Sequence, residues 1–482
     1  MVFSSIPFLF YYLPCVLALY YLMPVRGKNF ILLLASLFFY AWGEPKYLLF
    51  MVLSILQGYA FGLLIEKYRG SSLARIFLAA SVVFSLGLLG YCKYADFFLK
   101  SFNAVTGLSI PLLQIALPIG ISFYTFQVLS YTVDVFREQV EAQKNPVILA
   151  LYVAMFPQLI AGPIVRYSDV AAQLVKRSHT IDGAALGIRR FILGLAKKVL
   201  LANALGELCS IFRESQDTSV LFYWLYAAAY VLHVYFDFSG YSDMAIGLGK
   251  LFGFDFPENF HYPYIAKSIT EFWRRWHMTL GSWFRDYVYI PLGGNRVSKG
   301  RWMVNLLIVW ILTGLWHGAA WNFVVWGLFF GVVLMIEKLW LKDFLAGKRL
   351  LGHVYVLLLV AVSFVIFGAE SMGEAVQYLR AMFGASGIPA TSVEGLYYLR
   401  SYLVILILAV IGATPLPGKA ILAVKQLGGA GQSSNAKSAG LGETMGERIL
   451  NLLEPIVLVL LLAISTASLV NGSFNPFLYF RF

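Results

Sequence analysis

Two histidines are the residues of this chain best suited to chemistry. His277 and His317 lie 40 residues apart, and each directly follows a tryptophan within an apolar stretch. An imidazole inside a membrane is costly to bury and usually marks function. Its ordinary pKa of about 6.5 also suits proton transfer at neutral pH. The pair therefore predicts a proton-transfer site, although a buried histidine with a structural role is the alternative for His317.

The other four histidines and the three cysteines indicate no second site. His179 and His353 fall in loops or at helix edges, and His261 falls in a turn. His233 precedes Asp237 by one helical turn, so a structural hydrogen bond between the two is the favoured interpretation. The cysteines lie apart, in or beside apolar stretches, which indicates packing residues and predicts neither a metal site nor a disulfide.

Motifs of several soluble enzyme classes are missing from the sequence. It has no G-x-S-x-G elbow, no H-E-x-x-H zinc motif and no Walker or G-x-G-x-x-G phosphate loop. The His-x4-Asp pattern of soluble acyltransferases is also absent, because Ser282 and Asn322 stand five residues after the two histidines. Hydrolases of those types and nucleotide-binding enzymes are therefore excluded.

The composition places the histidines in a membrane. Of 482 residues, 60% are hydrophobic and 13% are charged, whereas a soluble protein carries about 25% charged residues. Inside lipid, a helix pairs all of its own backbone N–H and C=O groups. This composition therefore predicts an all-α integral membrane protein with one polytopic domain over 1–482. The net charge of +12 is typical of basic cytoplasmic loops, and nucleic acid is not expected as a partner.

Apolar stretches near the length of about 20 residues that spans a bilayer recur along the chain. We expect helices near 6–24, 30–42, 47–65, 76–92, 112–135, 191–209, 219–236, 353–369, 400–417 and 454–470. Basic residues on both sides of 146–163 predict that this segment does not cross. A flexible cytoplasmic loop is expected near 427–444, which is rich in Gly, Ser, Ala and Asn.

The histidines fall in a predicted catalytic segment, 268–331. Ser268 and Glu271 match a capping box, which predicts the start of an amphipathic helix that presents Trp273 and His277 on one face. The apolar runs 303–315 and 320–336 then predict a hairpin with His317 at its turn. The first run covers only about 20 Å and would not cross the bilayer.

Polar residues near this segment are candidates for binding substrate. Asp237, Ser239, Tyr241 and Asp243 follow the predicted end of a helix, where they form either a capping cluster or the wall of a polar cavity. Arg274 and Arg275 could bind the phosphates of an acyl donor or could anchor the helix at the cytoplasmic interface.

Several longer motifs occur in one order along nearly the whole chain. They are Phe39-Tyr40-Ala41-Trp42, Leu117–Phe126, Ile160-Ala161-Gly162-Pro163, Tyr235–Ala245, Glu271-Phe272-Trp273-Arg274-Arg275-Trp276-His277, Trp316-His317-Gly318-Ala319 and Phe474-Asn475-Pro476-Phe477. In these motifs the chain resembles membrane-bound O-acyltransferases of the alginate O-acetyltransferase type.

The resemblance implies a fold, a reaction and a site. The fold is a ring of about 11–12 transmembrane helices, with re-entrant and membrane-parallel helices, around a thin centre with funnels on both faces. His317 would be catalytic and His277 the second functional histidine. The candidate substrate-binding residues are Trp316, Asn322, Asp237, Ser239, Tyr241, Asp243, Arg274, Arg275, Trp273 and Trp276.

The resemblance also implies substrates and partners. The donor would be acetyl-CoA or an acyl carrier thioester on the cytoplasmic side, with no bound cofactor or metal. An extracytoplasmic acetyltransferase would pass the acetyl group to a surface polysaccharide such as alginate. Membrane lipid would surround the protein in the bacterial inner membrane. D-alanyl transfer from a carrier protein to teichoic acid, and transport of a lipid-linked sugar without catalysis, are the alternatives.

Overall fold

The computed structural model describes residues 1–43, 45–159, 161–427 and 444–472, and within these ranges the chain forms helices and no strand. The predicted all-α class is confirmed. The α-helices are α1 Leu13–Leu22, α2 Lys28–Gly43, α3 Leu48–Lys67, α4 Ser72–Leu89, α5 Ala95–Thr106, α6 Ile121–Phe136, α7 Pro146–Ala154, α8 Phe156–Leu159, α9 Tyr167–Val175, α10 Ile181–Ala196, α11 Asn203–Glu214, α12 Val220–Leu251, α13 Ile269–Trp273, α14 Met278–Phe284, α15 Lys299–His317, α16 Trp321–Ile336, α17 Lys342–Leu345, α18 Arg349–Gly368, α19 Met372–Met382, α20 Val393–Ser401, α21 Leu403–Gly412, α22 Leu416–Lys425 and α24 Met445–Asn471.

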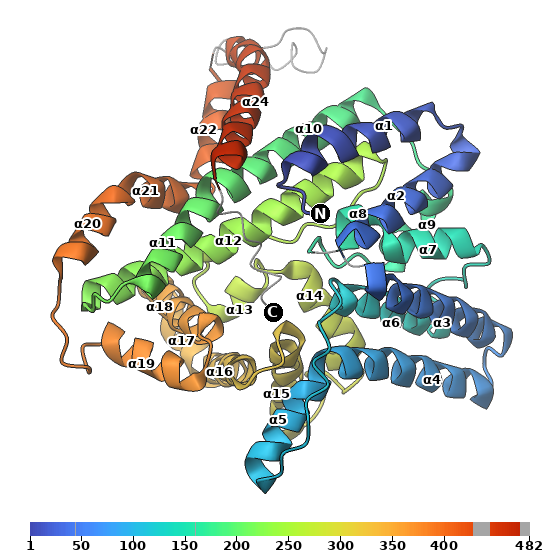
Figure 1. Cartoon of the computed structure of the whole chain (residues 1–482), viewed down its shortest axis with the longest axis horizontal. Coiled ribbons are helices and arrows are strands. Elements are labelled where there is room, and N and C mark those ends of the chain that lie inside the picture. The colour runs from blue at the N-terminus through green and yellow to red at the C-terminus, as the bar shows by residue number, and fades with distance from the viewer. Residues whose placement is uncertain (44, 160, 428–443, 473–482) are drawn as a thin grey trace.

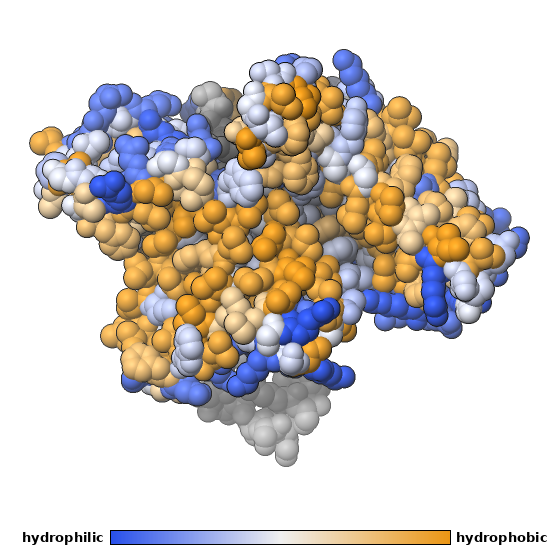
Figure 2. Space-filling model, turned by 90° about the horizontal axis from the view of Figure 1, so that it is seen from below, coloured by the Kyte–Doolittle hydropathy of each residue, from blue (hydrophilic) through white to orange (hydrophobic). Residues whose placement is uncertain are grey.

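Within the described ranges, six helices are long and apolar enough to cross a membrane. The pair α20 and α21, bent by 54°, makes a seventh if it counts as one span. These are fewer than the 11–12 spans expected, because several apolar segments form shorter or broken helices. In Figure 2 a hydrophobic belt crosses the face of the molecule between margins rich in hydrophilic residues, as a multi-pass membrane protein requires.

The short helices α13 and α14 lie in the middle of the molecule (Figure 1). Helices α10, α11 and α12 cross the structure diagonally on one side of them, and α2 to α4 with α6 to α9 lie to their right. The hairpin of α15 and α16, followed by α17 to α19, lies on the opposite side. The longer helices thus surround the segment that carries His277.

Helix α12 is the main correction to the expected elements. It runs for 32 residues, so the polar cluster from Asp237 to Asp243 lies inside a helix and not at its end. Glycines let α12 approach α10 closely, because a Cβ at Gly240 would meet the backbone oxygen of Gly194. Arg190 of α10 and Lys197, which directly follows that helix, pair with Asp243 of α12, so this carboxylate is satisfied by a neighbouring element and not by a turn.

The hairpin predicted around His317 is present. Helix α15 ends at His317 and α16 begins at Trp321. A Cβ at Gly314 would meet the carbonyl of Phe323, and one at Gly327 would meet the carbonyl of Trp310, so these glycines permit close packing. Helix α15 has 19 residues and is about 28 Å long. It is longer than the apolar run 303–315 because it begins in polar residues at Lys299, and it is not among the helices apolar enough to cross a membrane.

Two other expectations are changed or limited by the structure. The helix expected at 112–135 begins at Ile121, because Gly120 adopts a left-handed conformation with φ 77° after the irregular segment 107–118. Segment 146–163 contains α7 and α8, of nine and four residues, too short to span about 30 Å of hydrocarbon. Residues 428–443 of the predicted loop, Ile160 and the motif at 474–477 lie outside the described residues.

Candidate active site

The loop between α13 and α14 positions His277. Ser268 caps α13, since its Oγ accepts the backbone N–H of Glu271 at 3.0 Å. The chain then leaves the helix after Trp273, and His277 adopts a left-handed conformation with φ 43° and ψ 52°. The continuous amphipathic helix predicted here is wrong, so Trp273 and His277 do not share one helical face.

His277 is buried and held by one hydrogen bond. Its Nδ1 lies 3.1 Å from Oδ1 of Asn259, and its ring packs edge-on against Phe238 with 4.7 Å between ring centroids. Its other nitrogen, Nε2, has no hydrogen-bond partner among the residues that the structure describes. The ring is therefore oriented through Nδ1, while Nε2 is buried without a hydrogen-bond partner in the described part of the chain.

His317 lies at the end of α15 among aromatic rings. Its ring centroid is 5.1 Å from that of Trp326 and 5.2 Å from that of Phe367. Lys93 donates from Nζ to the carbonyls of Trp316 at 2.6 Å and of His317 at 3.4 Å. These bonds supply partners for carbonyl groups that the end of a helix leaves unpaired.

The indole of Trp316 joins the two histidines. Its ring centroid is 5.7 Å from that of His277 and 4.9 Å from that of His317, and its side chain is only 2% exposed. The structure thus brings both histidines into contact with the same indole. The predicted substrate-binding role of Trp316 remains a proposal, but its position is at the centre of the site.

The polar residues of α12 point in different directions. Asp237 forms a buried ion pair with Lys198, with 2.5 Å between Nζ and Oδ1. The ring of Tyr241 stacks on Phe3 with centroids 4.5 Å apart. The possible hydrogen bond from His233 to Asp237 is replaced by a contact of His233 Nδ1 with the carbonyl of Ala202 at 2.7 Å. Asp237 and Tyr241 thus connect α12 to the surrounding protein.

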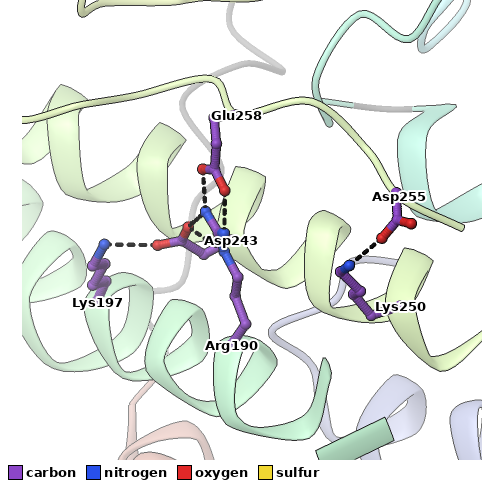
Figure 3. A network of polar contacts seen from close by, with 6 residues as sticks. All are labelled: Arg190, Lys197, Asp243, Lys250, Asp255 and Glu258. Atoms are coloured by element: carbon purple, nitrogen blue, oxygen red, sulfur yellow. Dashed lines mark hydrogen bonds and ion pairs between the residues drawn. The ribbon is translucent and has the colours of Figure 1, made fainter. Parts of the chain in front are cut away.

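Ser239 and Asp243 instead line a cavity of about 210 Å³ together with Asn259. Figure 3 shows that Arg190 reaches both Asp243 and Glu258, while Lys197 approaches Asp243 from the other side. The Lys197 Nζ to Asp243 Oδ2 distance is 2.6 Å. This network joins α10 and α12 to the segment that precedes His277, and the charge of Asp243 is compensated.

The remaining apolar and amide candidates pack between helices. Asn322 donates from Nδ2 to the carbonyls of Phe367 at 3.3 Å and Ala369 at 3.0 Å, which connects α16 to the end of α18. Trp273 packs against the indole of Trp310, with centroids 4.7 Å apart. Trp276 packs against Phe272 and Phe364. The described contacts of these three candidates are therefore packing and interhelical ones.

The two arginines before His277 differ. Arg275 forms an ion pair with Glu271 at 2.8 Å and donates to the carbonyl of His261 at 3.2 Å. Burial raises the pKa of Glu271, but hydrogen bonds from the backbone of Lys267 and from Arg275 hold it below its usual range. Arg274 is exposed, so it is the arginine that can meet an anionic ligand without losing an internal partner.

Three polar residues near the site were missed by the sequence analysis. Lys93 lies at the end of an apolar stretch, and a lysine at membrane depth is a signal that could have identified it. Lys198 carries the same signal. Asn259 stands two residues before a histidine that was assigned no role, and no local pattern in the sequence connects it to His277.

Known proteins resemble this chain over much of its length. A model of the membrane-bound O-acyltransferase family matches residues 46–346. The chain is 43% identical to a probable alginate O-acetylase of Azotobacter vinelandii, over 100% of both chains. It is 34% identical to a peptidoglycan O-acetyltransferase of Helicobacter pylori, over 80% of this chain and 81% of the other. A teichoic acid D-alanyltransferase of Bacillus subtilis is 30% identical over 45% of this chain and 58% of its own.

Proposed function

The chain belongs to the membrane-bound O-acyltransferase family and is an acyltransferase, and we propose that it moves acetyl groups from a cytoplasmic thioester toward a surface polysaccharide. The donor would be acetyl-CoA or a carrier thioester, and the membrane would be the bacterial inner membrane. An extracytoplasmic acetyltransferase would take part in the final transfer. Similarity over the full length of an alginate O-acetylase favours acetyl over D-alanyl transfer.

The observation that supports catalysis is the meeting of His277 and His317 at the indole of Trp316. In the proposed reaction the ring of His317 takes the proton of the acceptor hydroxyl. The hydroxyl oxygen attacks the thioester carbonyl, the C–S bond breaks, and the leaving thiolate takes the proton from the imidazolium of His317, which returns to the neutral base. General base catalysis of this kind contributes about 10²–10⁴-fold. His277 lines the path of the donor and orients or polarises the thioester.

The two arginines before His277 and the cavity beside Asp243 are candidate binding sites for the donor. Arg274 is exposed and could meet donor phosphates, whereas Arg275 is paired with Glu271. Asn259 lines the cavity beside Asp243 and is hydrogen-bonded to His277. Ser239 and Asp243 are therefore proposed to line the approach to the site, and Asp237, Tyr241, Asn322, Trp273 and Trp276 to support it.

Acyl transfer by purified protein tests the proposed function. We expect the protein to consume a labelled acetyl thioester when an acceptor is present, and His317→Ala to abolish this turnover while the protein still folds. A transporter of lipid-linked sugars or a non-catalytic scaffold would show no thioester consumption in wild type. That result, obtained with correctly folded protein, would exclude the proposed reaction.

A further inference from the structure

The segment around Asn259 holds the loop in which His277 lies. Met278 donates its backbone N–H to the carbonyl of Asn259 at 3.0 Å, and His261 donates to the carbonyl of Arg275 at 2.9 Å. The two segments are thus paired on both sides of His277. A left-handed conformation at a residue other than glycine is unfavourable by about 1–3 kcal/mol, and these bonds help to maintain it. Asn259 therefore has a fixed position relative to the imidazole.

The orientation of the Asn259 amide follows from backbone donors. The N–H of Thr279 donates to Oδ1 of Asn259 at 3.4 Å. The N–H of Ile164 donates to the hydroxyl of Thr279 at 3.0 Å, which leaves the hydroxyl proton to be donated to the same Oδ1 at 2.9 Å. On the other side, Nδ2 of Asn259 donates to Ser242 at 3.0 Å. Backbone N–H groups can only donate, so the atom that faces His277 is an acceptor.

This acceptor determines the tautomer of His277. Oδ1 of Asn259 lies 3.1 Å from Nδ1, so the neutral imidazole carries its proton on Nδ1 and a lone pair on Nε2. Nε2 is buried and has no hydrogen-bond partner within the described ranges. Phe238 and Trp316 pack against the same ring, with centroids 4.7 and 5.7 Å from that of His277. The titratable group nearby is His317 at the end of α15, whose ring contacts the same indole of Trp316.

We propose that Asn259 is the positioning residue that fixes His277 as a hydrogen-bond acceptor at Nε2. The group it receives is an N–H or O–H of a substrate, either an amide of the thioester donor's arm or the acceptor hydroxyl. This inference rests on the proposed function, in which His277 lies on the path of the donor. It also narrows that function, because a neutral ring with its proton on Nδ1 has no proton at Nε2 with which to polarise a carbonyl.

Kinetics with each substrate varied separately test the positioning role. Loss of one uncharged hydrogen bond corresponds to about a two- to tenfold effect. We expect Asn259→Leu and His277→Ala each to raise the KM of the bound substrate by this factor, with a smaller change in kcat. The double variant should be no worse than His277→Ala. A rise in donor KM identifies the donor amide, and a rise in acceptor KM identifies the hydroxyl. Additive effects of the two changes would overturn the proposal.

Two further variants separate positioning from folding. Asn259→Asp keeps an oxygen toward Nδ1 but adds a charge that favours the imidazolium, whose Nε2 carries a proton and cannot accept, so it should raise the same KM as Asn259→Leu does. Asn305→Leu is the matched control, because Asn305 is a buried asparagine whose amide binds the carbonyls of Leu292 and Gly294 away from the histidines. It should lower the yield of folded protein but leave both KM values unchanged. A wild-type KM for both substrates in folded Asn259→Leu would overturn the proposal.

Nitrogen NMR of histidine-labelled protein tests the tautomer without relying on activity. The signals of His277, assigned by their loss in His277→Gln, should show a protonated Nδ1 and an unprotonated Nε2 in wild type. Asn259→Leu should change this pattern, and Asn305→Leu should not. A proton on Nε2 in wild type would overturn the inference. This NMR result does not depend on the proposed function. The proposed function is tested separately and fails if the wild-type protein consumes no thioester.

Discussion

His277 and His317 contact the same indole but are positioned by different parts of the structure. His277 lies in a loop between helices of five and seven residues, and the side chain of Asn259 holds its ring. His317 ends a helix of 19 residues, and Lys93 binds the carbonyls of that helix end. One histidine is thus oriented through its ring and the other through the backbone that carries it. The two should respond differently to substitution.

The largest expected effect is at His317. His317→Gln keeps a polar side chain of similar size but cannot accept the hydroxyl proton, so kcat should fall by about 10²-fold or more while donor KM stays near normal. His277→Ala should instead raise the KM of the substrate that it contacts. Substantial acetyl transfer by folded His317→Gln would remove His317 as the base and reverse the assignment of the two histidines.

A smaller effect is expected at the end of α15. Lys93→Met removes a charged donor from the carbonyls of Trp316 and His317, which should lower the free energy of unfolding by about 1.5–3 kcal/mol. It should also reduce kcat, since His317 loses its fixed position, with little change in donor KM. Thermal unfolding in detergent and steady-state kinetics measure the two quantities.

Tyr94→Phe provides the matched control for Lys93→Met. The hydroxyl of Tyr94 donates to the carbonyl of Leu315 at 2.6 Å, one residue before Trp316. Loss of this neutral bond should cost about 0.5–1.5 kcal/mol and should affect kcat less. An equal loss of kcat in the two variants would show that the charge of Lys93 has no particular role in holding His317.

The sequence predicted the half of the site that depends on local patterns. Small residues and apolar runs indicated the hairpin that turns at His317, and the tryptophan before that histidine contacts both histidine rings. The loop at His277 was not predictable, because it depends on backbone bonds to residues 259–261. The continuation of α12 was missed for a related reason. Asp237 and Asp243 are polar residues that rarely occur inside an apolar helix. Here they form ion pairs, Asp243 with Arg190 and Lys197 and Asp237 with Lys198.

The smallest expected effect distinguishes the two arginines beside His277. Arg274 is exposed, so Arg274→Gln should raise donor KM by about two- to fivefold, equivalent to the ~0.5–1 kcal/mol of an exposed charge pair. The salt dependence of donor KM should weaken as well, because an exposed charge is screened at physiological ionic strength. Arg275 already binds Glu271 and the carbonyl of His261, so Arg275→Gln should reduce stability and leave the donor's salt dependence intact. Donor KM measured across a salt series for both variants checks this.

If Arg275→Gln alone removed the salt dependence of donor KM, Arg274 would instead anchor the protein at the membrane interface. The donor would then approach His277 from the side of the Glu271 pair.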